Sequence, residues 1–184
     1  MRWAGLVTPV GDLAVAVDEA GVCAVRFGPP PVGPAATVGP PRAGGGPVAA
    51  VGQVRADRPD PLVEAVRQLE EYLAGDRVTF TLPLSPTRGT AFERAVWAAF
   101  TAIPYGRTRT YGEIAATVGE PGAARAVGTA CNRNPLPVLL PCHRVVGAGG
   151  RLVGFGGGLA WKRALLGLEA RVVIEREFGS ADRD

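Results

Sequence analysis

The first part of the chain alternates larger apolar side chains with smaller or polar ones in a way that predicts β-strands. Leu13, Val15 and Val17 are separated by smaller side chains, and a similar run follows over residues 22–27. Gly11-Asp12 and residues 18–21 have the composition of turns. A period of two with short turns is typical of antiparallel strands, so residues 6–27 are expected to form a small antiparallel sheet.

A helix is predicted after this sheet. Asp60-Pro61 has the form of an N-cap followed by proline at the first helical position, and Gly75 has the form of a C-terminal stop. The apolar residues at helical spacing are Leu62, Val66, Leu69 and Leu73. Residues 78–84 are then expected to add one more strand.

Two capping boxes predict helices further along the chain, Thr90 with Glu93 and Thr110 with Glu113. The residues expected to form a buried stripe behind the first box are Phe92, Ala95, Val96, Ala99, Phe100 and Ile103. The second box opens a short helix that Gly119 and Pro121 end, and another short helix follows at about residues 122–132.

This pair of short helices has the length and turn of a helix-turn-helix, although two ordinary packed helices are the more common outcome for this pattern alone. The second helix is almost entirely Ala and Gly, and Arg125 is its only long side chain before Arg133. Such a surface offers no set of side chains to read base edges. If it binds DNA, we expect docking in the minor groove without sequence preference.

Charge and composition narrow the choice of partner. The net charge of +3 divides into +7 over residues 88–163 and −4 over the rest. A strongly basic half is the pattern expected of a protein that binds a polyanion. Codon bias accounts for the excess of Arg over Lys, but not for the scarcity of acids in this half.

The remaining composition excludes several classes. Apolar residues make up 47% of the chain, but no run of them is long enough to cross a membrane. Residues 28–61 are rich in Pro and Gly and are expected to form a surface loop. No signal peptide is evident, so a cytoplasmic protein with three free cysteines is expected. The spacing of Cys and His does not predict a metal site.

The candidate chemistry lies at Cys142-His143, which contains the only histidine in the chain. A thiolate is the reactive form of cysteine, and a nearby histidine can accept its proton. Adjacent residues of a strand point to opposite faces, so direct contact needs a turn or a bridging water. A buried structural cysteine beside a hydrogen-bonded histidine is the alternative at this point.

The segment Pro141-Cys142-His143-Arg144-Val145 resembles the active-site motif of the O6-alkylguanine-DNA alkyltransferases. Further segments resemble that family in the same order along the chain, over about residues 88–169. These are Ile103-Pro104-Tyr105-Gly106, Tyr111-Gly112-Glu113-Ile114-Ala115, Ala123-Ala124-Arg125-Ala126-Val127-Gly128, Asn134-Pro135 and Gly154-Phe155-Gly156-Gly157-Gly158. The N-terminal part is similar more weakly, through residues 8–13 and 62–75.

The resemblance implies a set of roles. Cys142 would accept the alkyl group, His143 would act through a water as its base, Glu169 would orient the imidazole, and Asn134 would be a hinge. Tyr111, Arg125, Arg133, Arg144, Phe155 and Gly156 would bind DNA or the extruded base, with Arg125 filling the space that the flipped nucleotide leaves.

The resemblance also implies a fold and a reaction. A ribonuclease-H-like α/β domain of antiparallel strands plus a helix (1–84, with the loop 28–61) would precede a mainly α domain with a helix-turn-helix (88–169) and a tail (170–184). The reaction would be a single-turnover transfer from O6-alkylguanine, and from O4-alkylthymine, in double-stranded DNA, without cofactor or metal. The protein would be a cytoplasmic monomer, associated with the nucleoid during repair, that clusters on DNA and binds no membrane.

Two other functions remain open from the residues alone. A Cys–His hydrolase or thiol transferase would turn over repeatedly and would not need the basic half. A helix-turn-helix protein without enzymatic activity would bind with sequence preference and would tolerate Cys142→Ala.

Overall fold

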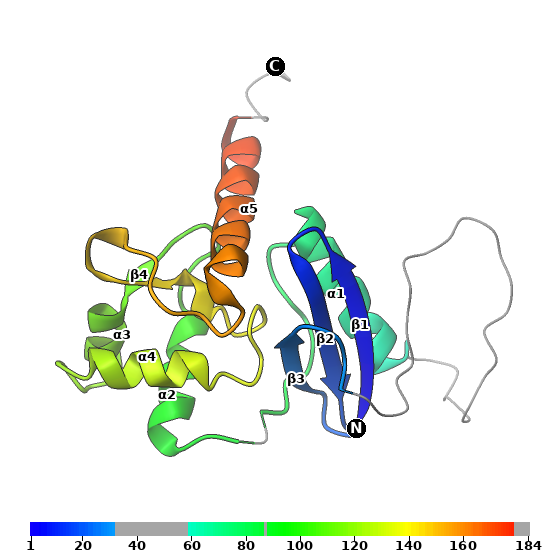
Figure 1. Ribbon diagram of the computed structural model, residues 1–184, viewed down its shortest axis with the longest axis horizontal. Coiled ribbons are helices and arrows are strands. Elements are labelled where there is room, and N and C mark those ends of the chain that lie inside the picture. The colour runs from blue at the N-terminus through cyan, green and yellow to red at the C-terminus, as the bar shows by residue number, and fades with distance from the viewer. Residues whose placement is uncertain (32–58, 87, 179–184) are drawn as a thin grey trace, which may run out of the picture.

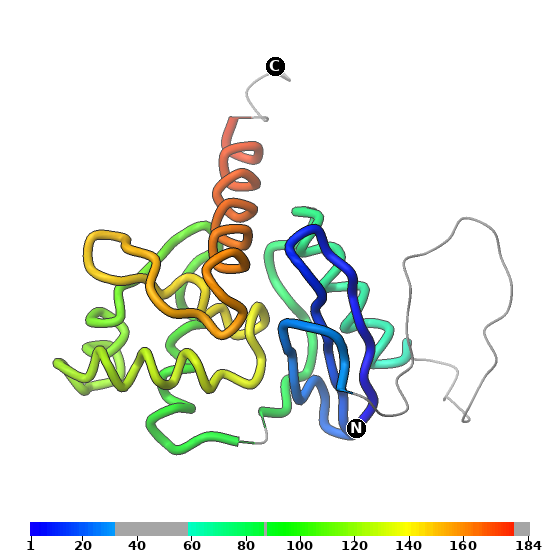
Figure 2. Tube along the Cα trace, in the orientation of Figure 1, coloured from blue at the N-terminus to red at the C-terminus, as the bar shows by residue number. Residues whose placement is uncertain are grey.

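The computed structural model describes residues 1–31, 59–86 and 88–178. Its strands are β1 (Arg2–Thr8), β2 (Gly11–Val17), β3 (Val22–Phe27), β4 (Arg109–Thr110) and β5 (Val145–Val146). Its helices are α1 (Pro61–Ala74), α2 (Ala91–Thr101), α3 (Tyr111–Thr117), α4 (Ala124–Asn132) and α5 (Gly158–Phe178), with 3-10 turns η1 (Cys142–Arg144) and η2 (Ala148–Gly150). The sheet β1–β3 with α1 forms one half of the molecule and α2–α5 the other (Figures 1 and 2).

The predicted antiparallel sheet is confirmed, in the order β1-β2-β3. α1 packs on it through buried residues that include Leu62, Val66 and Leu69. The Asp60 side chain accepts the N–H of Leu62, and Gly75 ends the helix in the left-handed conformation, both as expected. Most of the Pro/Gly-rich loop expected at 28–61 lies outside the described residues.

The strand expected at 78–84 is wrong. Within that segment only Leu84 forms a β-bridge, an isolated parallel one with Val22. Pro83 cannot donate to a ladder, and the N–H of Thr81 donates to the side chain of Gln68. The backbone N–H of Thr81 is therefore bonded to a side chain of α1 and is not available to a neighbouring strand, so a regular strand does not form here.

The helical half contains both predicted capping boxes, at the starts of α2 and α3. α3 and α4 pack against each other across a turn, as a helix-turn-helix requires. The buried stripe of α2 is rotated from the expected one, because Ala95 is exposed and Trp97 is buried in its place. The Trp97 indole N–H donates to the carbonyl of Ala130 on α4 at 2.8 Å, so the larger ring determines which face is buried.

The last helix differs from the expected tail. The sequence places a boundary at residue 169, whereas α5 continues without a break to Phe178 and buries Val172. Gly75 and Gly106 both have positive φ, and a Cβ on them would lie 2.8 Å and 2.5 Å from side-chain atoms of Val172 and Val173. Glycine at these two positions therefore permits α5 to pack closely on the segments that contain them.

Candidate active site

Cys142 begins the 3-10 turn η1 directly after Pro141, and its side chain is buried. Burial raises the pKa of this thiol to about 11, while the Asn134 amide and the charge of Lys162 lower it. The resting thiol is therefore protonated near neutral pH, and a nucleophilic reaction requires a group that removes its proton.

His143 and Glu169 form that group. The imidazole Nε2 lies 2.8 Å from Glu169 Oε1, and both side chains are fully buried. Nδ1 has no hydrogen-bond partner among the described residues. Because Nε2 must donate to the carboxylate, Nδ1 carries the lone pair. The 3-10 turn replaces the extended strand that would have pointed neighbouring side chains to opposite faces.

Burial and charge set the protonation of this pair. Burial opposes ionisation of Glu169, but bonds from His143 and Arg144 outweigh it and hold the carboxyl pKa at about 2. Burial also lowers the pKa of His143, against the raising effect of Glu169. The neutral imidazole is thus favoured, which is the form that can accept a proton.

Arg144 requires a correction. The resemblance implies that Arg144 contacts DNA or substrate. In the structure, however, its guanidinium is buried inside the protein and is not available for such a contact. Its Nε and Nη2 donate to Glu169, and its Nη1 donates to the carbonyl of Ile103 at 2.7 Å. A guanidinium beside a buried carboxylate neutralises it, so Arg144 supports Glu169.

Tyr72 is a residue of the site that the sequence patterns do not reveal. It lies on α1, is fully buried, and donates from its hydroxyl to Glu169 Oε1 at 2.5 Å. The hydroxyl oxygen is also 3.3 Å from His143 Nε2. Helical periodicity could have placed it on the buried face, but no local signal connects it with a carboxylate 97 residues away.

Asn134 joins α4 to the segment that carries Cys142. Its amide nitrogen donates to the carbonyl of Leu140 at 2.7 Å, and its side-chain oxygen accepts the N–H of Leu136 at 2.9 Å. These bonds close the loop around Val138, whose φ of 76° is unusual for a β-branched residue. Asn134, the expected hinge residue, therefore connects the end of α4 to residues 136–140 by hydrogen bonds.

A pocket of about 280 Å³ lies against Cys142. Phe155 and Gly156 form part of its wall, as the resemblance implies, and Cys131 and Asn132 of α4 form another part. The sheet contributes Val25, Arg26 and Phe27. Phe27 packs on Phe155 with ring centroids 5.2 Å apart, so both halves of the molecule shape this pocket.

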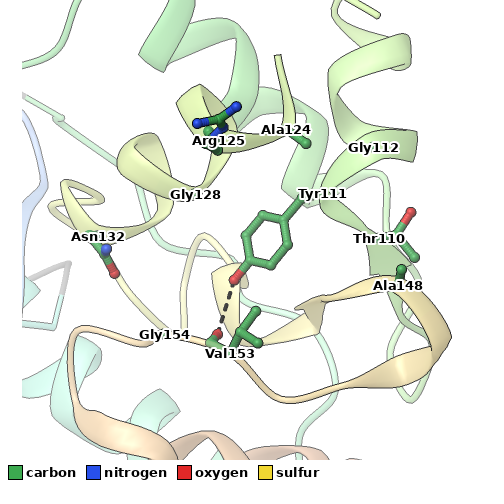
Figure 3. A pocket seen from close by; sticks show the side chains of 10 residues that line it. All are labelled: Thr110, Tyr111, Gly112, Ala124, Arg125, Gly128, Asn132, Ala148, Val153 and Gly154. Carbon is green, nitrogen blue, oxygen red and sulfur yellow. Dashed lines mark hydrogen bonds between the residues drawn. The ribbon is translucent and has the colours of Figure 1, made fainter. Parts of the chain in front are cut away.

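A second pocket of about 600 Å³ lies between α3, α4 and the loop after η2 (Figure 3). Its lining residues are Thr110, Tyr111, Gly112, Ala124, Arg125, Gly128, Asn132, Ala148, Val153 and Gly154. The Tyr111 side chain extends into it and its hydroxyl donates to the carbonyl of Val153 at 3.2 Å, while Arg125 projects from α4 at the edge of the pocket (Figure 3). Asn132 lines both pockets, which places them next to each other.

Lys162 contacts residues that line both pockets, and the sequence patterns do not predict it as a site residue. The ammonium is buried and donates to the carbonyls of Val145 and Val153 at 2.6 Å and 3.2 Å. It also faces the rings of Tyr111 and Phe155, at 5.7 Å and 5.9 Å from their centroids. A buried cation here favours the thiolate form of Cys142.

Arg133, the other expected DNA contact, is exposed and pairs with Glu93 at 3.0 Å. Across residues 1–31, 59–86 and 88–178, no group of three or more His, Cys, Asp or Glu residues could hold a metal ion. No helix in those ranges is long and apolar enough to cross a membrane.

Comparisons with known proteins agree on one family. Two family models match the chain. The ribonuclease-like domain of 6-O-methylguanine DNA methyltransferase matches residues 1–86, and the DNA binding domain of 6-O-methylguanine DNA methyltransferase matches residues 91–171. The chain is 42% identical to a methylated-DNA–protein-cysteine methyltransferase of Methanosarcina acetivorans, over 92% of this chain and 98% of the relative. It is 55% identical to one of Mycobacterium leprae, over 60% and 67%.

Solved structures give the same result. Mycobacterium tuberculosis OGT in complex with DNA matches with a TM-score of 0.73 and 38% identity, over 94% of both chains. The O6-methylguanine methyltransferase of the same organism matches with a TM-score of 0.70 and 37% identity, over 92% of this chain and 93% of that one.

Proposed function

The chain belongs to the methylated-DNA–protein-cysteine methyltransferase family, whose reaction is direct-reversal DNA repair by alkyl transfer to the protein's own cysteine, and we propose that Cys142 is the acceptor. The observation that carries the proposal is the position of this thiol, on a pocket and next in sequence to the buried His143–Glu169 pair. Cys131 lines the same pocket, but burial raises its pKa further. Cys23 donates to the carbonyl of Ala16 in the sheet.

The proposed reaction follows from the protonation of these groups. Neutral His143 takes the thiol proton at Nδ1 through a water molecule, while Glu169 holds Nε2–H and stabilises the imidazolium that forms. The sulfur attacks the alkyl carbon on guanine O6, a C–S bond forms, the C–O bond breaks, and its electron pair goes to the guanine. The guanine anion takes up a proton at N1 from water, and the imidazolium returns its proton to water, so that neutral guanine and neutral His143 result. The product is a thioether, which the protein cannot hydrolyse, so each molecule reacts once.

The DNA partner is supported by the basic helical half and by the relative solved in complex with DNA. We propose that α4 enters the minor groove, because its Ala and Gly surface permits close approach without reading bases. Arg125 would occupy the place of the extruded nucleotide, with Tyr111 beside its path. Arg133 would contact a phosphate from its exposed position.

The extruded guanine, or an O4-alkylthymine, would enter the pocket at Cys142. Phe155 would form its wall, and the backbone N–H of Gly156 would donate to the base oxygen. We further propose that the protein acts in the cytoplasm as a monomer that clusters on DNA. No cofactor takes part in this scheme, because the thiol itself receives the alkyl group.

The deciding experiment uses a duplex that carries labelled O6-methylguanine, followed by peptide mass mapping. We expect one methyl group per protein molecule, on Cys142, and no second turnover. Cys142→Ala should abolish transfer and Cys131→Ala should retain it. Label on Cys131 or Cys23 would overturn the assignment. Repeated release of methanol would indicate a hydrolase, and binding without transfer would indicate a DNA-binding protein alone.

A further inference from the structure

We propose that Tyr72, on the N-terminal half of the molecule, is a positioning residue for alkyl transfer that acts through Glu169 on the basicity of His143. The proposal rests on the function assigned to His143 above, and it adds a residue outside the motif region. Its basis is the hydrogen bond from Tyr72 Oη to Glu169 Oε1, at 2.5 Å in a fully buried environment.

The fold keeps Tyr72 in place as a permanent donor. The ring packs on Phe80 at 5.1 Å and on Tyr105 at 5.8 Å between centroids, and α1 anchors its backbone on the sheet. Burial and the adjacent carboxylate of Glu169 raise the pKa of the phenol well above its ordinary value. The hydroxyl therefore remains protonated and donates throughout the working pH range.

The carboxylate of Glu169 accepts hydrogen bonds from four groups. Oε1 accepts from His143, Tyr72 and Arg144, while Oε2 accepts from the backbone N–H of Gly106 at 2.8 Å and from Arg144. A donor on Oε1 withdraws negative charge from the oxygen that faces the imidazole. Tyr72 thereby weakens the attraction of the carboxylate for imidazolium and keeps His143 in its neutral, basic form.

The sign of this effect depends on two opposing contacts. The Tyr72 oxygen, 3.3 Å from Nε2, would favour imidazolium, whereas its proton, shared with Oε1 at 2.5 Å, disfavours it. The shorter bond to a charged acceptor is the stronger. The titratable and charged groups that interact with the imidazole or this hydroxyl are Arg144, Lys162, Glu169 and Tyr105, and Cys142 is next to His143 in sequence. Tyr72→Phe removes none of these groups, so the loss of the hydrogen bond to Glu169 is the change that is tested.

The chain supplies a matched control. Tyr105 is a second tyrosine beside Tyr72, and its buried hydroxyl has no hydrogen-bond partner in the described part of the chain. Tyr105→Phe removes the same atom from the same aromatic cluster without removing a donor from Glu169. Tyr72→Phe removes the donor and keeps the ring.

The test is a nitrogen NMR titration of the side chain of His143, which is unambiguous because the chain contains a single histidine. We expect Tyr72→Phe to raise the His143 pKa by roughly 0.5 to 1 unit, the equivalent of one net hydrogen bond. Tyr105→Phe should leave it unchanged. An unchanged pKa in Tyr72→Phe, or an equal shift in both variants, would overturn the proposal.

Two further measurements complete the test. The acidic limb of the single-turnover rate against pH should move upward with the His143 pKa in Tyr72→Phe, which a loss of packing alone would not cause. If Tyr72→Phe does not fold, 3-fluorotyrosine at position 72 keeps the ring, donates more strongly and should lower the His143 pKa; an unchanged or raised pKa would overturn the proposal. The NMR titration does not depend on which cysteine is alkylated, so it separates this proposal from the assignment of Cys142.

Discussion

Glu169→Gln removes one charge from the centre of the site and keeps the shape of the side chain. Glutamine can still accept from His143 and Tyr72, but it leaves the buried guanidinium of Arg144 without a counter-charge. Breaking such a buried pair leaves an uncompensated charge, which is the costly outcome for an ion pair.

The size of the effect follows from the pKa of Glu169, about 2 in the fold against 4.5 ordinarily. Each unit corresponds to about 1.4 kcal/mol, so ionised Glu169 stabilises the fold by about 3 kcal/mol. A depressed carboxyl pKa contributes stability that is complete above about pH 4.5 and is lost as the pH falls towards 2. Glu169→Gln should therefore cost about 3 kcal/mol near neutral pH and about 1 to 2 kcal/mol near pH 3.

Urea denaturation of both proteins at the two pH values measures these free energies of unfolding. Glu175→Gln, on the same helix, is the control: its pair with Arg171 is exposed and should contribute less than about 1 kcal/mol. A Glu169→Gln variant as stable as the parent, or one with the same deficit at both pH values, would refute the reasoning.

Three further predictions concern the surroundings of the thiol. Lys162→Met should raise the pKa of the Cys142 thiol and slow alkyl transfer about tenfold near neutral pH, and the rate should recover in more alkaline buffer. Equal single-turnover rates for the variant and the parent near neutral pH would contradict this prediction. Gly157→Ala would place a Cβ 2.5 Å from the Phe27 ring and should cost about 1 to 3 kcal/mol by thermal unfolding, whereas Gly156→Ala, which has open space, should not. Arg125→Ala should slow repair in duplex DNA at least about tenfold more than reaction with free O6-benzylguanine, measured by single-turnover rates; equal losses would remove its proposed role.

Local signals in the sequence predicted much of the fold. The N-cap at Asp60, the stop at Gly75 and the boxes at Thr90 and Thr110 each depend on residues within one helical turn, so neighbours alone determine them. The strand expected at 78–84 does not form: the side chain of Gln68, thirteen residues before Thr81, accepts the backbone N–H of Thr81, and Pro83 has no N–H to donate. Propensity cannot anticipate a partner of that kind.

Residues of the site could be predicted from the sequence only where they belong to a segment that resembles a known motif. His143 and Glu169 were expected together, and the structure places them 2.8 Å apart. Arg144 was assigned to the wrong side, since a basic residue in a DNA-binding half is more often exposed than buried beside a carboxylate. Tyr72 and Lys162 were missed because their importance comes from tertiary contacts, with a carboxylate on α5 and with two backbone carbonyls.

The placement of α5 has a consequence for folding cooperativity. This helix follows the helix-turn-helix in the chain, yet it contacts the sheet half at three levels: Trp161 packs on Phe27, Glu169 accepts from Tyr72, and Val172 covers Gly75. If the two halves unfolded separately, each would expose a partner that the other buries. The two domains should therefore melt in a single calorimetric transition, and a fragment that lacks the first 86 residues should lose order along α5 as well as the sheet.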